Sequence, residues 1–142
     1  MAAFPHATVG TFRYGPAIRG DSLVRRDGAS TEWWLILDID PELGRYLRAE
    51  YSRLRYRTVV PQPPLWGTHV SVIRGEEPPD ETAWKKFDGE RVEVRYAAGV
   101  FETKEYLWLP VACPPANAIR AELGLPPDPT PAMHLTFGNT KG

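Results

Sequence analysis

The chain has 142 residues, 42% of them apolar and 11% aromatic, which is enough for one hydrophobic core. Its formal net charge of -1 argues against the basic surface of a protein that binds duplex nucleic acid, although it is compatible with a small anionic ligand. The longest apolar run, residues 33–37, is far shorter than the ~20 residues of a membrane span, and the N-terminus has no hydrophobic secretory core. A lone Cys113 cannot form an internal disulfide. We expect one cytoplasmic domain over residues 1–142, with no membrane contact and no obligate protein partner.

Two strands are predicted in the first third of the chain. Residues 8–14 alternate polar and apolar side chains, which is typical of a half-exposed strand. Residues 32–39 form a continuous apolar run rich in β-forming residues, which predicts a central strand covered on both faces. Residues 15–31 connect them and are rich in Gly, Pro, Asp and Ser, so this long connection is either a loop or a lid, and the sequence leaves that choice open.

An amphipathic helix follows the second strand. Asp40 is suited to cap its N-terminus and Pro41 to occupy its first position. The outer face carries arginines between Arg45 and Arg57, and we interpret it as a solvated surface, with attraction of phosphate as the alternative. The apolar residues that recur with helical spacing are Leu43, Leu47, Tyr51 and Leu54.

The rest of the chain alternates strands with short helices. Residues 69–74 follow a proline-rich connection and have the period of a strand, and Pro110 within residues 105–112 places that later strand at an edge or a bulge. The order of elements predicts an α+β domain with helices packed on a largely antiparallel sheet. The other expected elements are a short helix at 81–87, a strand at 90–96, a helix at 115–123 and a closing strand at 132–137.

Two of the three histidines share one local pattern. His69 with Ser71 and His134 with Thr136 both follow the pattern His-x-Ser/Thr inside an apolar strand. Residues i and i+2 of a strand project from the same face, with Cβ atoms roughly 6–7 Å apart. Each motif therefore presents one imidazole and one hydroxyl to the same space, and two such strands would form a symmetrical pocket.

A pocket of this kind is suited to displacement at phosphorus. One neutral imidazole can remove a proton from an attacking hydroxyl group or water, while the opposite imidazolium donates a proton to the departing oxygen. The two hydroxyl groups can hydrogen-bond the non-bridging oxygens of the phosphate. Proton transfer of this kind contributes roughly 10²–10⁴-fold per group and requires no metal ion.

The alternative is that both are ordinary strand histidines. Serine and threonine make up 14 of the 142 residues, so two such matches occur by chance about once in a hundred. His6, which also has a hydroxyl residue two places later, lies near the terminus and lacks the same strand context. A zinc site is disfavoured because no other His or Cys lies at ligand spacing around Cys113. We therefore favour a catalytic pair and expect no cofactor or metal.

Paired His-x-Ser/Thr motifs on strands of an α+β domain resemble those of the two-histidine (2H) phosphoesterase superfamily. The segment WGTHVSVIRGEEPPDETAWKKFDGERVEV and the ending MHLTFGNTKG are similar to the compact branch found in bacteriophages, which includes the anti-CBASS phosphodiesterases that destroy cyclic-oligonucleotide signals. The segments VGTFRY and WWLILDID also fit this branch, so the likeness spans most of the chain outside residues 15–31. Ser71 stands where many members have Thr, and the hydroxyl group is retained.

The resemblance implies a bilobal fold of largely antiparallel sheets, with helices packed outside and the ligand in a central cleft between two pseudo-symmetric halves. It implies that His69 and Ser71 from one half and His134 and Thr136 from the other are catalytic. The implied reaction is metal-independent cleavage of a 3′–5′ linkage, with the neighbouring ribose 2′-hydroxyl as nucleophile. Which histidine is the base and which is the acid does not follow from the sequence.

Several residues outside the motifs are candidates for binding a nucleotide. Trp66, just before the first motif, and Tyr14, at the end of the first strand, could stack on bases. Trp108 falls in a regular strand pattern and is interpreted as a core residue. The cations expected nearest a phosphate are Arg13, Arg74 and Lys141.

The expected function is that of a phosphodiesterase acting on a cyclic di- or trinucleotide second messenger, in the host cytoplasm if the protein is phage-encoded. One alternative is an enzyme that opens 2′,3′-cyclic phosphates at RNA ends, and another is a non-catalytic protein that sequesters a cyclic nucleotide. A short chain with few basic residues outside residues 45–57 suits a small cyclic ligand better than a long RNA. The presence of both histidines disfavours the non-catalytic alternative.

Overall fold

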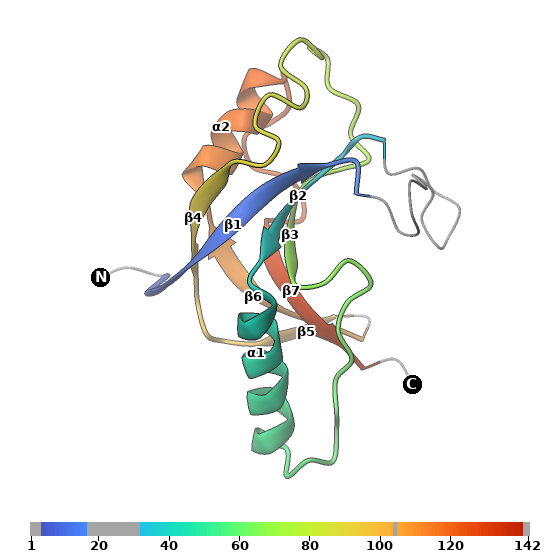
Figure 1. Cartoon of the computed structure of the whole chain (residues 1–142), viewed down its shortest axis with the longest axis vertical. Helices are drawn as coiled ribbons and strands as arrows, with labels where there is room; N and C mark the ends of the chain where they lie inside the picture. Colours follow the sequence, from blue (N-terminus) through green and yellow to red (C-terminus); the bar gives the residue numbers. More distant parts are fainter. Residues whose placement is uncertain (1–3, 17–31, 104, 141–142) are drawn as a thin grey trace.

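The computed structural model describes residues 4–16, 32–103 and 105–140, and Figure 1 shows how their elements are arranged. The predicted strands and the two longer predicted helices all correspond to elements of the structure, with shifts of a few residues at their ends. The described elements are β1 (His6–Tyr14), β2 (Trp34–Ile39), α1 (Pro41–Leu54), β3 (His69–Arg74), β4 (Arg91–Tyr96), β5 (Phe101–Thr103), β6 (Tyr106–Ala112), α2 (Pro114–Glu122) and β7 (His134–Asn139).

The strands form one sheet in the order β4-β1-β2-β3-β7-β6-β5, and every pairing between these described strands is antiparallel. A further pairing of β4 with β6 closes six of the strands into a barrel, and β5 extends the sheet beside β6. The structure is therefore α+β with an antiparallel sheet, as expected. It contains one continuous sheet rather than two clearly separate lobes, because β3 pairs directly with β7.

A single hydrophobic core takes up one face of the barrel strands and one side of each helix. β2 contributes to both faces, since Leu35 and Leu37 lie in this core while Trp34 and Ile36 are buried on the opposite face. The predicted central strand covered on both faces is thus confirmed. Burial of each such side chain stabilises the fold by about 1.5–3 kcal/mol. Other members of the core are Phe12, Tyr14, Val70, Val72, Val94, Leu107, Leu109, Ala116, Ile119, Leu135 and Phe137.

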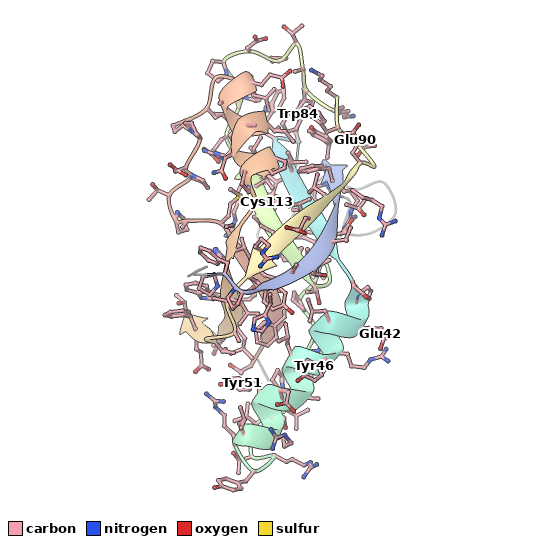
Figure 2. The ribbon with its side chains drawn as sticks, turned by 90° about the vertical axis from the view of Figure 1, so that its left-hand side faces the viewer. Glu42, Tyr46, Tyr51, Trp84, Glu90 and Cys113 are labelled. Carbon is pink, nitrogen blue, oxygen red and sulfur yellow. The ribbon has the colours of Figure 1, made fainter. Side chains whose placement is uncertain are left out.

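Helix α1 begins as the sequence predicts and is held close to the end of β2. The Asp40 side chain accepts a hydrogen bond from the Glu42 N–H, and Pro41 occupies the first turn. Tyr51 packs into the core, while Tyr46 is 61% exposed on the outer side of the helix (Figure 2). Neither helix in the described parts of the chain is long and apolar enough to cross a membrane.

Glycine at position 44 allows α1 to approach the residue that precedes the first motif. A Cβ at Gly44 would collide with the Thr68 side chain. Thr68 is buried, and its carbonyl accepts a hydrogen bond of 3.0 Å from the Ile39 N–H. The start of β3 is therefore fixed between α1 and the end of β2.

Three local features differ from the sequence predictions. Residues 81–87 form hydrogen-bonded turns instead of a helix, because Lys85 adopts the left-handed conformation with φ of 69° and interrupts helical geometry. The short strand β5 was not predicted, since it has only three residues.

The edge position expected from Pro110 was wrong, because β6 has partners on both sides, although β6 does contain an irregularity between Leu107 and Trp108 in its pairing with β7. The carbonyl of Pro110 accepts a hydrogen bond from the Ala97 N–H, and the ring nitrogen of Pro110 points to the same side of β6 as this carbonyl. On that side, Pro110 lies between the part of β6 that pairs with β5 and the part that pairs with β4. No ladder hydrogen bond is required there, and proline is tolerated without an edge position.

Candidate active site

The structure brings the two His-x-Ser/Thr motifs side by side. In the antiparallel pairing of β3 with β7, His69 lies opposite Thr136 and Val70 opposite Leu135. The same register, continued by one residue, places Ser71 opposite His134. Directly opposed residues of antiparallel strands have Cβ atoms roughly 4.5–5.5 Å apart. The two imidazoles and the two hydroxyl groups therefore occupy adjacent positions on one face of the sheet.

This face is the one that points away from the hydrophobic core. Val70 and Leu135, the middle residues of the two motifs, are fully buried members of that core. His69 and Thr136 are each 9% exposed, while Ser71 and His134 are half-buried. The site therefore has one buried histidine, His69, and one more exposed histidine, His134.

Both imidazoles are oriented by the same backbone contact. The Nδ1 atom of His69 lies 2.8 Å from the Gly67 carbonyl oxygen, and that of His134 lies 2.9 Å from the Ala132 carbonyl oxygen. A carbonyl oxygen only accepts hydrogen bonds, so in each ring Nδ1 carries the proton and donates it. Nε2 is then the position at which each imidazole gains or loses a proton.

Each motif strand is also held by an arginine from the helix that packs against it. Arg120 of α2 donates to the Val72 carbonyl at 2.9 Å, and Arg48 of α1 donates to the Phe137 carbonyl at 2.8 Å. In both strands the accepting residue lies three positions after the histidine. α1 precedes β3 in the chain but contacts β7, and α2 precedes β7 but contacts β3. Each helix therefore packs against the motif strand that does not follow it directly in the chain.

The surroundings of His69 favour its neutral form. Burial lowers the pKa of His69, and the nearby positive groups of His134 and Arg74 lower it further, against the opposing effects of the Gly67 carbonyl and of Asp38. Asp38 of β2 is the cross-strand neighbour of His69.

Arg13 and Asp38 form an ion pair on the same face. Asp38 lies opposite Thr11 and His69 in the two neighbouring strands, and the Arg13 guanidinium bonds both of its carboxylate oxygens at 2.8 and 3.0 Å. Arg13 was expected near a phosphate. The structure places it in β1, which is separated from β3 and its motif by β2. Asp38 was not singled out from the sequence, because its place beside His69 depends on the register of β2 with β3.

Aromatic rings flank both histidines. Trp66 lies at 6.1 Å from His69 and at 4.5 Å from Trp34, while Trp108 lies at 5.0 Å from His134, all between ring centroids. Trp66 was predicted to lie near the site, whereas Trp108 was interpreted as core. Trp108 is instead a partly exposed neighbour of the motif pair, because its partner in the sheet is Thr136.

Of the other predicted ligand residues, Tyr14 lies away from the motifs, whereas Arg74 lies near enough to His69 to lower its pKa. Tyr14 is buried in the core, on the opposite face from the histidines, and its ring contacts Trp84 at 4.9 Å. Arg74 ends β3 with its guanidinium 5.1 Å from the Trp34 ring. Lys141 and residues 17–31 of the expected loop or lid lie outside the described residues.

The basic residues of α1 have partners within the protein. Arg45 and Arg53 pair with Glu42 and Glu50, and Arg55 lies over the Tyr51 ring at 3.6 Å. These contacts agree with the interpretation of this helix face as a solvated surface. A cavity of about 450 Å³ lies along its arginines and reaches Val60 and Pro61.

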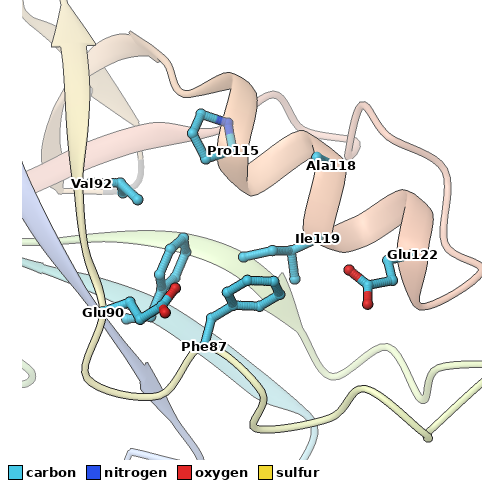
Figure 3. Close-up of a pocket in the computed structure, with 8 residues that line it drawn as sticks. Phe87, Glu90, Val92, Pro115, Ala118, Ile119 and Glu122 are labelled. Atoms are coloured by element: carbon cyan, nitrogen blue, oxygen red, sulfur yellow. The ribbon is translucent and has the colours of Figure 1, made fainter.

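A second cavity, of about 210 Å³, lies between α2 and β4 (Figure 3). Its lining is largely apolar and includes Phe12 and Ile119 of the core face. Phe12 projects from the opposite face of the sheet to the histidines, so this cavity is separate from the motif pair.

Comparison of the chain with models of known protein families, with curated proteins and with solved structures gave no match.

Proposed function

We propose that the protein is a phosphodiesterase that cleaves the 3′–5′ linkages of a cyclic di- or trinucleotide by acid–base catalysis with His69 and His134. The observation that carries this proposal is the pairing of the two motif strands, which sets one imidazole and one hydroxyl from each on a single face. The shared Nδ1 contacts add support, because they leave Nε2 of both rings for proton transfer.

The two histidines take different roles in this proposal. A general base must be neutral before it accepts a proton, and burial lowers the pKa of His69. His69 is therefore the base. His134 is more exposed and donates the proton to the leaving oxygen.

The proposed reaction proceeds in two steps. In the first, Nε2 of His69 removes the proton of a ribose 2′-hydroxyl group, the 2′-oxygen forms a bond to phosphorus, and the bond from phosphorus to the 5′-oxygen breaks. Nε2–H of His134 donates its proton to that departing oxygen. In the second, water attacks the resulting 2′,3′-cyclic phosphate with the proton-transfer roles reversed, so that both histidines return to their starting states.

The remaining polar groups of this face stabilise the charge that develops. The hydroxyl groups of Ser71 and Thr136 donate hydrogen bonds to the non-bridging oxygens, and Arg13 supplies positive charge nearby. Because the imidazoles carry out both proton transfers, the reaction needs no metal ion. The matched arginine contacts of Arg48 and Arg120 support a site built from two pseudo-symmetric halves, as the resemblance to two-histidine phosphoesterases implies.

Product analysis tests this proposal. The purified protein is incubated in EDTA with cyclic di- and trinucleotides and with 2′,3′-cyclic AMP, and the products are separated by chromatography. Linear oligonucleotides from the cyclic substrates are the expected result. Turnover of 2′,3′-cyclic AMP alone would favour the RNA-end enzyme, and intact ligand that elutes with the protein would favour sequestration.

A further inference from the structure

An exposed pair of stacked aromatic rings lies beside His134. The ring centroids of Phe101 in β5 and Trp108 in β6 are 4.7 Å apart, and their planes differ by 17°. The Trp108 ring also contacts His134, at 5.0 Å. Phe101 is 50% exposed, so its ring is accessible to a ligand. We call Phe101 and Trp108 the aromatic ledge.

The register of the sheet places the aromatic ledge on the catalytic face. Trp108 lies opposite Thr136 in β7, and Phe101 lies opposite Trp108. Directly opposed residues share a face of the sheet, so both rings lie on the face of the two motifs. The indole Nε1–H donates to the Thr103 hydroxyl oxygen at 3.2 Å, which fixes the plane of the Trp108 ring.

We propose that the aromatic ledge binds the base of the leaving nucleoside by stacking. This inference rests on the proposed function, in which His134 protonates the departing 5′-oxygen. The nucleoside that carries this oxygen must lie on the His134 side of the phosphorus atom, where the ledge is. A flat phenyl face accepts any base, because every base has a π-face. The aromatic ledge is therefore used only by substrates of at least two nucleotides, and it is tolerant of the base at this position.

Kinetics with two substrates test the role of the aromatic ledge. 2′,3′-Cyclic AMP has no leaving nucleoside, whereas cyclic tri-adenylate has one. The Phe101→Ala variant is expected to lose at least about tenfold in kcat/KM for cyclic tri-adenylate, within the range that stacking of one base contributes. Its kcat/KM for 2′,3′-cyclic AMP is expected to change less than about twofold, and Phe101→Tyr, which keeps a ring, is expected to restore the first activity. Tyr46→Ala removes an exposed ring from α1 and serves as the control.

An equal loss for both substrates, or no loss for cyclic tri-adenylate, would overturn the proposal. A binding measurement separates this failure from failure of the proposed function. The 2′-deoxy dinucleotide d(ApA) has no attacking hydroxyl group, and its binding is measured by quenching of tryptophan fluorescence. Weaker binding by Phe101→Ala than by Tyr46→Ala would support the aromatic ledge even if the wild-type protein cleaved nothing, and equal binding would contradict it.

Discussion

The β3 and β7 halves of the site share a backbone plan but differ in their surroundings. Each half has a histidine with Nδ1 bonded to a carbonyl two residues earlier, and an arginine that binds the carbonyl three residues later. His69 is buried beside Asp38, whereas His134 is more exposed beside Trp108. In the proposed mechanism one repeated motif supplies both the base and the acid, because the environment of each imidazole sets its preferred protonation state.

Removal of either imidazole is expected to have the largest effect on activity. His69→Ala and His134→Ala are each expected to lower kcat by at least about 10² and up to about 10⁴, because each removes one proton transfer. Turnover of a cyclic trinucleotide measures the loss, and circular dichroism checks the fold. His6→Ala, at an exposed histidine that contacts Tyr96 in β4, is the control and should retain full activity. Near-normal turnover in either motif variant would remove that residue from the mechanism.

The two arginines that hold the motif strands offer a comparison in stability. Arg120 is 1% exposed and also bonds both carboxylate oxygens of Glu76, at 2.8 and 2.9 Å. Arg120→Met is expected to lower the free energy of unfolding by about 2–4 kcal/mol, because it leaves the buried Val72 carbonyl without its donor and removes the hydrogen bonds to the half-exposed Glu76 carboxylate. Arg48→Met removes a single hydrogen bond at a less buried site and is expected to cost about 1 kcal/mol.

Urea denaturation of the two arginine variants provides the measurement. Equal losses of stability would mean that the two motif strands are held equally strongly, which would contradict the greater burial of Arg120. The pair with Glu76 also predicts a pH dependence, since Arg120 lowers the pKa of that carboxyl. Its contribution is complete above the unfolded pKa of Glu and is lost as the pH falls through the lower folded value, and Arg120→Met should abolish this part of the acid destabilisation.

The two motif hydroxyl groups should contribute less than the imidazoles. Ser71→Ala and Thr136→Val are each expected to lower kcat about 10- to 150-fold, which is the value of one hydrogen bond to a charged group. The measured quantity is single-turnover cleavage of a cyclic trinucleotide. Thr136→Ser keeps the hydroxyl group and should recover most of the activity. If it does not, the threonine acts through packing.

The smallest expected effect concerns the carboxylate beside His69. Asp38 raises the pKa of His69, so Asp38→Asn should lower it further. A base with a lower pKa stays neutral to more acidic pH, and the acid limb of the kcat/KM profile should therefore move to lower pH, by less than about one unit. Glu93→Gln removes the same charge from β4 and should leave the limb in place. A shift to higher pH would contradict the assignment of His69 as the base.

Local signals predicted most elements of the fold. The Asp40–Pro41 start of α1 and the alternation of β3 depend on neighbouring residues, and the structure confirms both. The turns at residues 81–87 were mistaken for a helix because the left-handed conformation of Lys85 leaves no pattern in the sequence.

The candidate site was predictable only in its motifs. His69 and His134 were found because a short strand pattern encodes which side chains share a face. Their pairing, the position of Asp38 and the exposure of Trp108 depend on strand register between segments distant in the chain. Arg120 looked like an ordinary helix residue, since its partners Val72 and Glu76 lie more than forty positions earlier.

The pH dependence of kcat/KM for the wild-type protein, measured in EDTA with a cyclic trinucleotide, tests most directly whether the two imidazoles act as a base and an acid on one phosphorus atom. The paired mechanism predicts a bell-shaped profile whose acid limb lies below the ordinary histidine pKa of about 6.5, because His69 is buried. His69→Ala should lose that limb. A wild-type rate that rises steadily with pH, without a fall on the alkaline side, would contradict the paired mechanism.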